Sequence, residues 1–228
     1  MFFLPRYFLT IIILFALQQG VAAQCPVIPQ PVQATKQASQ FLLNQQTAMV
    51  VENERLQAGA NYLQQKMLQQ YHIAVSRQAN ASKNVIRWQL STDKQMPVEG
   101  YSIRMRNDEV IVSAIDAKGA FNAAVSLLQL AADAKKGDAV LLLDCWNITD
   151  APLYGWRGFM LDESRHFFGK AKVKSLLDWM AFYKLNRFHW HLTDEPGWRL
   201  EIKQYPLLHL VGGIGNYTNP FAPATYYT

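Results

Sequence analysis

The sequence has 228 residues, of which 50% are hydrophobic and 17% charged, a composition typical of a globular protein with one large or two smaller packed domains. The formal net charge of +5 is spread along the chain without a run of Lys and Arg, so the charge pattern does not favour a nucleic-acid-binding protein. The two cysteines, Cys25 and Cys145, are too few for a disulfide framework, and whether they form one bridge stays open.

Residues 1–23 have the organisation of a cleavable export signal. Arg6 provides a positive start, an apolar run extends from Tyr7 to Leu17, and small residues at 21–23 precede the expected cleavage site. The apolar run is shorter than the roughly 20 residues that a membrane-spanning helix needs. We therefore expect an exported protein without a membrane anchor after cleavage, periplasmic or extracellular, or lysosomal in a eukaryote.

Short strand patterns alternate with two helical patterns up to residue 150. The helices are predicted over 54–70 and 119–131, where apolar residues recur every three or four positions. Strands are predicted over 47–51, 73–75, 85–90 and 139–143, with a hairpin formed by 101–105 and 110–114. We expect an α+β domain over 24–150, an antiparallel sheet with two helices, and its sequence contains no phosphate loop, carboxylate cluster or metal-ligand spacing.

A strand, a helix and a second strand follow this domain. The strands are predicted over 156–161 and 187–192, and residues 171–184 between them carry apolar side chains at helical spacing. This order is typical of one right-handed parallel crossover unit of an α/β fold. One unit leaves sheet edges and half a helix uncovered, so we expect further strands, in a barrel or in a partner, and hence a longer protein.

Arg157 is the first candidate binding residue. It lies between Gly155 and Gly158, which would let another group approach the backbone closely. Its guanidinium could donate to hydroxyl or carboxylate oxygens of a ligand, or it could form a structural ion pair with Asp162 or Glu163. The local sequence favours neither alternative.

A second group of candidates follows the second strand. Asp194 and Glu195 come directly after it, at the carboxyl end where parallel α/β sheets bind their ligands. His189 and His191 lie on one face of the strand, and a nearby carboxylate would tune an imidazole. The two histidines with Asp194 also form a possible metal site, although a third strong ligand is missing.

Several motifs make the sequence similar to a known enzyme family. The strings are WRGFMLDESRHFF, KLNRFHWHLTDEPGWRLEI and YPLL in the second region, and IPQP and GAFNAAVSLLQL in the first. They resemble the chitobiase-type β-N-acetylhexosaminidases, family 20 of the glycoside hydrolases. The resemblance implies a non-catalytic α+β domain over 24–150 and, over 151–228, the incomplete start of a catalytic (β/α)8 TIM barrel.

The resemblance also implies a reaction without a cofactor. Such enzymes remove terminal N-acetylglucosamine or N-acetylgalactosamine from glycans or chitooligosaccharides with retention of configuration. The sugar's own 2-acetamido carbonyl attacks the anomeric carbon, a glutamic acid protonates the leaving oxygen, and an aspartate stabilises the acetamido group. The resemblance places this Asp–Glu pair on later strands, so we expect the present chain to have no turnover by itself.

Three residues receive roles by position in the resemblance. Arg157 matches the arginine that binds the terminal sugar's hydroxyls. Asp194 matches the aspartate that pairs with a histidine beside the acid, a histidine on a later strand. Glu195 stands where a second aspartate is common, so its role stays open. The alternatives to a hexosaminidase are a non-catalytic sugar-binding or assembly module and a metal-dependent barrel hydrolase that uses His189 and His191. The sequence does not indicate an oligomeric state.

Overall fold

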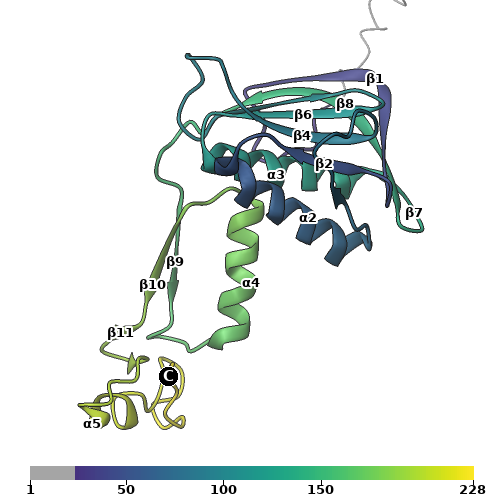
Figure 1. Cartoon of the computed structure of the whole chain (residues 1–228). Helices are drawn as coiled ribbons and strands as arrows, with labels where there is room; N and C mark the ends of the chain where they lie inside the picture. Colours follow the sequence, from purple (N-terminus) through teal and green to yellow (C-terminus); the bar gives the residue numbers. More distant parts are fainter. Residues whose placement is uncertain (1–23) are drawn as a thin grey trace, which may run out of the picture.

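The structure, a computed structural model, describes residues 24–228, which form a sheet domain and an elongated second region below it (Figure 1). The expected export signal, residues 1–23, lies outside the described residues. Within the part that is described, no helix is both long enough and apolar enough to cross a membrane.

The first region is an eight-stranded sheet with the strand order β1-β8-β5-β6-β4-β2-β3, and β7 pairs with β8. Its strands are β1 (Gln33–Leu43), β2 (Ala48–Val51), β3 (Ser76–Arg77), β4 (Val85–Leu90), β5 (Tyr101–Met105), β6 (Glu109–Ala114), β7 (Lys135–Gly137) and β8 (Val140–Asp150). Its helices are η1 (Glu54–Leu56), α2 (Gln57–Tyr71) and α3 (Ala117–Asp133). The α+β layer with two long helices is therefore confirmed.

The sheet is mixed and not antiparallel throughout, which corrects one detail of the expectation. β1, β8, β5 and β6 pair antiparallel, whereas β6, β4, β2 and β3 pair parallel. The helix α2 connects β2 to the parallel strand β3, because a helical crossover returns the chain in the same direction. The strand β5 lies between β4 and β6 in the sequence. Parallel pairing depends on these connections and not on the side-chain pattern within any one strand.

The predicted helices pack on one face of the sheet and on each other (Figure 1). Leu56, Leu63 and Met67, which the helical spacing places on one face, are buried in the core. A Cβ atom on Gly59 of α2 would lie only 2.7 Å from the backbone of Ala120 in α3. The two helices approach this closely because the contact residues are small.

The largest departure from the sequence pattern is β1, an eleven-residue strand that was not predicted. Its pairing with β8 shifts register between Lys36 and Gln40. Such an irregularity interrupts the two-residue alternation by which a strand is detected. Its partner β8 also extends further than the predicted 139–143, and the predicted strand over 73–75 is replaced by the two-residue β3.

The second region contains the predicted strand, helix and strand. β9 (Gly158–Asp162) and β10 (Arg187–His191) pair in parallel, and α4 (Gly169–Phe182) connects them. The short strands β11 (Thr193–Asp194) and β12 (Gly197–Trp198) follow, and then α5 (Pro206–Leu210). The β9–β10 ladder runs away from the sheet domain, so its carboxyl ends lie at the far end of the molecule (Figure 1).

Candidate active site

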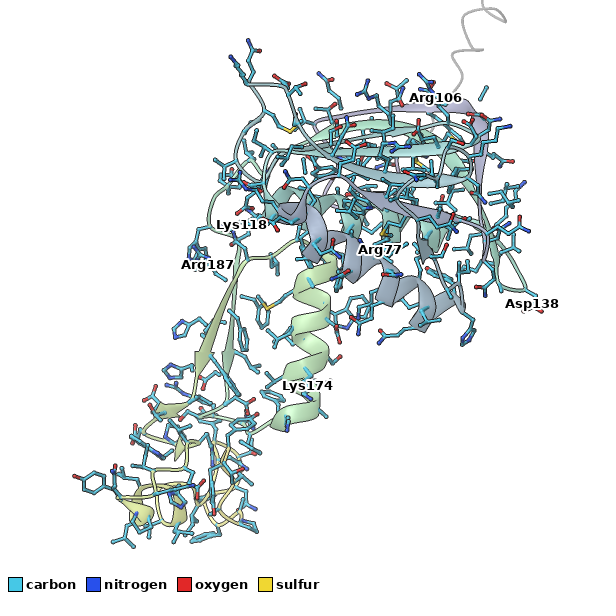
Figure 2. The ribbon with its side chains drawn as sticks, in the orientation of Figure 1. Arg77, Arg106, Lys118, Asp138, Lys174 and Arg187 are labelled. Atoms are coloured by element: carbon cyan, nitrogen blue, oxygen red, sulfur yellow. The ribbon has the colours of Figure 1, made fainter. Side chains whose placement is uncertain are left out.

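Polar side chains gather at the carboxyl ends of β9 and β10. Asp162 ends β9, His191 ends β10, and the two are direct partners in the parallel ladder. Arg165 lies in the loop after β9, and Asp194 lies in β11 directly after β10. We call these four residues the carboxyl-end cluster. Figure 2 shows Arg187, the first residue of β10, on the side of the sheet domain, so the cluster lies at the opposite end of the ladder.

Ionic contacts connect the members of the cluster. Arg165 Nη1 lies 2.9 Å from Asp162 Oδ2 and 2.6 Å from Asp194 Oδ2. His191 Nε2 lies 3.0 Å from Asp194 Oδ2 and 3.3 Å from Arg165 Nη1. A protonated Nε2 donates to Asp194, whereas an unprotonated Nε2 accepts from Arg165. The tautomer of His191 therefore decides which of the two neighbours Nε2 binds.

The local sequence explains why Arg165 reaches the cluster. The Asp162 side chain accepts hydrogen bonds from the backbone N–H groups of Ser164 at 3.0 Å and Arg165 at 3.1 Å. This is a turn held by an aspartate side chain, a preferred use of aspartate at the end of a strand. The turn brings the Arg165 guanidinium back to the carboxylate of Asp162 at the end of β9.

The cluster keeps Asp194 ionised. The backbone N–H of Glu195 and the His191 imidazole lower the pKa of Asp194, and the positive charge of Arg165 acts in the same direction. An ionised carboxylate is a suitable partner for orienting a guanidinium.

Arg165 is held by only one of its nitrogens. Its Nη1 makes every side-chain contact of the guanidinium within residues 24–228, which leaves Nε and Nη2 without an acceptor there. The side chain is 41% exposed. A guanidinium that is oriented at one corner and open at the others can donate to the oxygens of a ligand.

Arg157, which the resemblance matches to a sugar-binding arginine, has a different environment. It precedes β9 at the end of the ladder that faces the sheet domain. Its Nε donates to Lys184 O at 2.8 Å and its Nη1 to Tyr154 O at 2.7 Å. Its Nη2 forms an ion pair with Glu99 Oε2 at 2.6 Å. The alternative of a structural ion pair holds, but the partner comes from the sheet domain and is neither Asp162 nor Glu163.

A buried network surrounds Arg157. Lys184 Nζ lies 2.9 Å from Tyr101 Oη and 3.3 Å from Asp150 Oδ2, and Tyr101 also contacts Ser126 at 2.6 Å. Burial lowers the pKa of Lys184, an effect that Asp150 opposes, and burial raises the pKa of Tyr101. We call the ion pairs of Arg157 with Glu99 and of Lys184 with Asp150, together with Tyr101, the amino-end junction.

A cavity of about 510 Å³ adjoins this junction and is lined in part by Arg157, Tyr154 and Tyr183. The guanidinium nitrogens of Arg157 are already bonded to protein groups, so the cavity does not change its structural role. The two cysteines are both buried and unpaired. Burial raises the pKa of the Cys25 and Cys145 thiols.

Glu195 lies beside the cluster and not in it. Its backbone N–H donates to Asp194 Oδ1 at 2.8 Å, while its carboxylate has no hydrogen bond or ion pair within the described chain. It lines an open groove of about 800 Å³ together with Trp198 and Tyr205. Its role stays open.

The metal alternative requires three ligands in one place. His189 contacts His191 edge to face, with ring centroids 5.9 Å apart, and His191 pairs with Asp194. Across residues 24–228, no group of three His, Cys, Asp or Glu side chains is arranged to hold a metal ion. The imidazole of His191 is used in the ionic cluster.

Arg165 and Asp162 are the members that the sequence pattern did not indicate. The sequence suggests Asp162 only as a possible ion-pair partner of Arg157. The signal was present, because both residues follow the first strand as Asp194 follows the second, and parallel strands bring such positions together.

Comparison with known proteins agrees with this architecture. Residues 24–151 match the model of "Glycosyl hydrolase family 20, domain 2", and residues 154–228 match "Glycosyl hydrolase family 20, catalytic domain". A beta-hexosaminidase of Porphyromonas gingivalis is 35% identical over 192 residues, which cover 82% of this chain and 25% of that protein. A beta-N-acetylhexosaminidase of Cellulomonas fimi is 31% identical, with coverages of 85% and 41%.

Solved structures show the same relationship. A family 20 exo-β-N-acetylglucosaminidase of Vibrio harveyi superposes with a TM-score of 0.80 at 26% identity, over 91% of this chain and 33% of that one. A β-N-acetylhexosaminidase of Bacteroides fragilis gives 0.71 at 32% identity, over 86% and 39%. The chain thus spans about a quarter to two fifths of the length of these four relatives. With both regions matched, this chain belongs to glycosyl hydrolase family 20.

Proposed function

We propose that the protein is an exo-acting β-N-acetylhexosaminidase that removes terminal N-acetylglucosamine or N-acetylgalactosamine from glycans or chitooligosaccharides. The hexosaminidase relatives support this assignment, and one of them, from Vibrio harveyi, was solved in complex with N-acetylglucosamine. Because the chain spans less than half of these relatives, the activity is proposed for the full-length protein that contains it. The chain supplies the α+β domain and the first two strands of a TIM barrel.

The observation that carries the proposal is the guanidinium of Arg165, which lies at the carboxyl ends of the parallel strands and is bonded to described protein groups through Nη1 alone. We infer that Arg165, and not Arg157, donates to the hydroxyl oxygens of the terminal sugar. Asp162 and Asp194 hold its Nη1, so the remaining nitrogens are oriented before the sugar binds. Such preorganisation lowers the entropic cost of positioning the sugar for reaction.

Asp194 and His191 form the second functional unit in this proposal. The resemblance pairs Asp194 with a histidine on a later strand, whereas in this structure the imidazole beside it is that of His191. His191 Nε2 lies within hydrogen-bond distance of both Asp194 Oδ2 and Arg165 Nη1. We propose that Asp194 and His191 together orient Arg165 toward the sugar.

The chemical step is proposed to follow the substrate-assisted course of the family. The sugar's acetamido carbonyl attacks its anomeric carbon, and the configuration is retained after water opens the cyclic intermediate. No residue of the described chain is assigned as the proton donor. Residues 1–23 are proposed to direct export, and 24–150 and 151–228 are proposed as the domain boundaries.

The experiment is release of nitrophenol from nitrophenyl N-acetyl-β-glucosaminide, with the galactosaminide and the unmodified glucoside in parallel. The full-length protein should hydrolyse both N-acetylated substrates and leave the glucoside, which has no acetamido group, intact. The 228-residue chain, purified from a host without hexosaminidase, should release none. Hydrolysis of the glucoside at a comparable rate would contradict substrate assistance, and turnover by the 228-residue chain would show that its own residues suffice. No release by the full-length protein would refute the assignment.

A further inference from the structure

Arg199 is fully buried, with 0% of its surface exposed, which is unusual for a charged side chain. No carboxylate of the described residues forms an ion pair with it, and burial lowers its pKa while the charge of Glu163 opposes that effect. A buried guanidinium without a carboxylate must be satisfied by backbone carbonyls. Burying a guanidinium costs desolvation free energy, which these hydrogen bonds must offset. The loops that supply the acceptors are therefore held in place around Arg199.

The three nitrogens of the guanidinium together donate to three parts of the second region. Nε donates to Glu163 O at 3.0 Å, and Nη2 to Ser164 O at 3.0 Å and Gly215 O at 2.8 Å. Nη1 donates to Gly213 O at 2.7 Å and to Thr225 Oγ1 at 3.1 Å. One side chain thus joins the loop after β9, the glycine-rich loop after α5 and the last residues of the chain.

The backbone of Arg199 extends these connections to β10. Its N–H donates to Leu192 O at 3.0 Å, and its carbonyl accepts from Tyr227 N at 2.9 Å. Leu192 directly follows His191, and Glu163 and Ser164 directly precede Arg165. Arg199 therefore holds the main chain next to two members of the carboxyl-end cluster, although it touches neither of their side chains.

The neighbouring sequence makes room for this arrangement. A Cβ atom on Gly197 would lie 2.4 Å from Cζ of Arg199, so the glycine is required by the position of the guanidinium. Ser164 Oγ donates to Gly197 O at 2.9 Å in the same buried space. The loop after β9 and the β11–β12 hairpin are thereby packed around a single planar group.

We propose that Arg199 is a positioning residue for Arg165. By holding the main chain of the loop after β9, it fixes where the Arg165 guanidinium lies relative to Asp194 and the sugar. The inference rests on the proposed function for its catalytic consequence, but its structural part is independent of turnover. A lysine would not replace Arg199, because one ammonium nitrogen cannot reach carbonyls on three separate segments, whereas a planar guanidinium can.

The test uses the ring resonances of His191 in the 228-residue chain, because His191 Nε2 lies 3.3 Å from Arg165 Nη1 and reports where that group is. The chain has five histidines, and the His191→Gln variant identifies the resonance. Arg165→Gln defines the shift caused by direct loss of the guanidinium. Arg199→Lys should move the His191 resonance in the same direction by at least half as much.

A matched control separates positioning from general stability. Lys184→Met breaks the amino-end junction and should lower the melting temperature without moving the His191 resonance. If Arg199→Lys behaves in this way, with lower stability and an unmoved resonance, Arg199 is only structural and the proposal is wrong. Thr225→Val removes one acceptor of Arg199 and is expected to fold. It replaces Arg199→Lys in the test if the Arg199→Lys variant does not fold. It should give a smaller shift in the same direction, and no shift would also overturn the proposal.

The catalytic consequence is measured separately in the full-length protein. Arg199→Lys should lower kcat/KM by about 10-fold, chiefly through KM, because a displaced Arg165 loses hydrogen bonds to hydroxyls in the ground state and in the transition state alike. A shifted His191 resonance with unchanged kinetics would refute the sugar-binding role of Arg165 and leave the positioning by Arg199 intact. An unshifted resonance would refute the positioning whatever the kinetics.

Discussion

The two ends of the β9–β10 ladder each carry arginine and carboxylate side chains, but they use them differently. At the amino end, Arg157 and Lys184 are largely buried, with side-chain exposures of 15% and 6%, and pair with carboxylates of the sheet domain. At the carboxyl end, Arg165 and Asp194 are 41% and 36% exposed and pair within the ladder region. The buried charges at the amino end hold the two regions together, and the exposed charges at the carboxyl end remain available to bind a ligand.

Three of the four arginines of the second region show the difference most clearly. All three guanidinium nitrogens of Arg157 and of Arg199 donate to protein acceptors, whereas within residues 24–228 only Nη1 of Arg165 does so. The open donors of Arg165 lie at the end of the ladder where parallel α/β folds bind ligands. Arg187, at the amino end, also bonds to the described chain through Nη1 alone. Unused donors therefore indicate a binding role for Arg165 only together with its position at the carboxyl ends of the strands.

The largest expected effect is on stability at the amino end. Lys184→Met would leave Asp150 buried beside Tyr101 without its cation, and breaking such a buried pair costs about 3 kcal/mol. Denaturant titration of the chain should show this loss in the free energy of unfolding. The exposed Lys203→Met is the matched control and should change it little. A loss for Lys184→Met no greater than that of the control would mean that the junction does not fasten the two regions.

A pair of substitutions next tests whether the two ends differ in function. In the full-length protein, Arg165→Gln should lower kcat/KM for the nitrophenyl substrate roughly 10- to 100-fold with little change in melting temperature, because a charged donor contributes about 1.5–3 kcal/mol. Arg157→Gln should lower the melting temperature and leave KM unchanged, because Glu99 loses its closer partner and keeps only the exposed Lys118 at 3.5 Å. The reverse result would restore Arg157 as the sugar-binding residue.

Thiol reactivity should sharpen the comparison by reporting on the amino end alone. Cys25 is buried near Lys184 and Asp150, and burial raises the pKa of its thiol, so iodoacetamide should label it far more slowly than in urea. Lys184→Met should accelerate labelling of Cys25, and Arg165→Gln should not. Mass spectrometry of timed samples measures the rate at each cysteine. Equal rates at Cys25 in both variants would show that the two ends are not independent.

The smallest expected effect concerns pH and the exposed carboxyl end. Because the pKa of Asp194 is lowered in the folded chain, its ionised form stabilises the fold above the unfolded pKa of about 3.9, and this stabilisation is lost as pH falls through the folded value. Asp194→Asn should therefore melt slightly below the wild type at pH 7, and the difference should shrink toward pH 3. A difference that grows on acidification would contradict the contacts seen here.

Much of the fold could be predicted because local patterns express it. The apolar stripes of α2 and α3 and the β5–β6 hairpin follow from spacing and turn residues. The β9–α4–β10 unit follows from its element order. β1 could not be predicted because its register shift interrupts the alternation, and the parallel pairs of the sheet arise from connections that no single strand encodes.

The sequence by itself determined the family through long motifs, and it determined that Asp194 would lie at the carboxyl end of a strand. Only the tertiary structure decided which arginine accompanies it. Arg157 and Arg165 lie eight positions apart on either side of β9, so a strand of five residues places them at opposite ends of the ladder. The sheet domain, distant in sequence, supplies Glu99 to neutralise Arg157, so that of these two arginines it is Arg165 that keeps donors for a ligand.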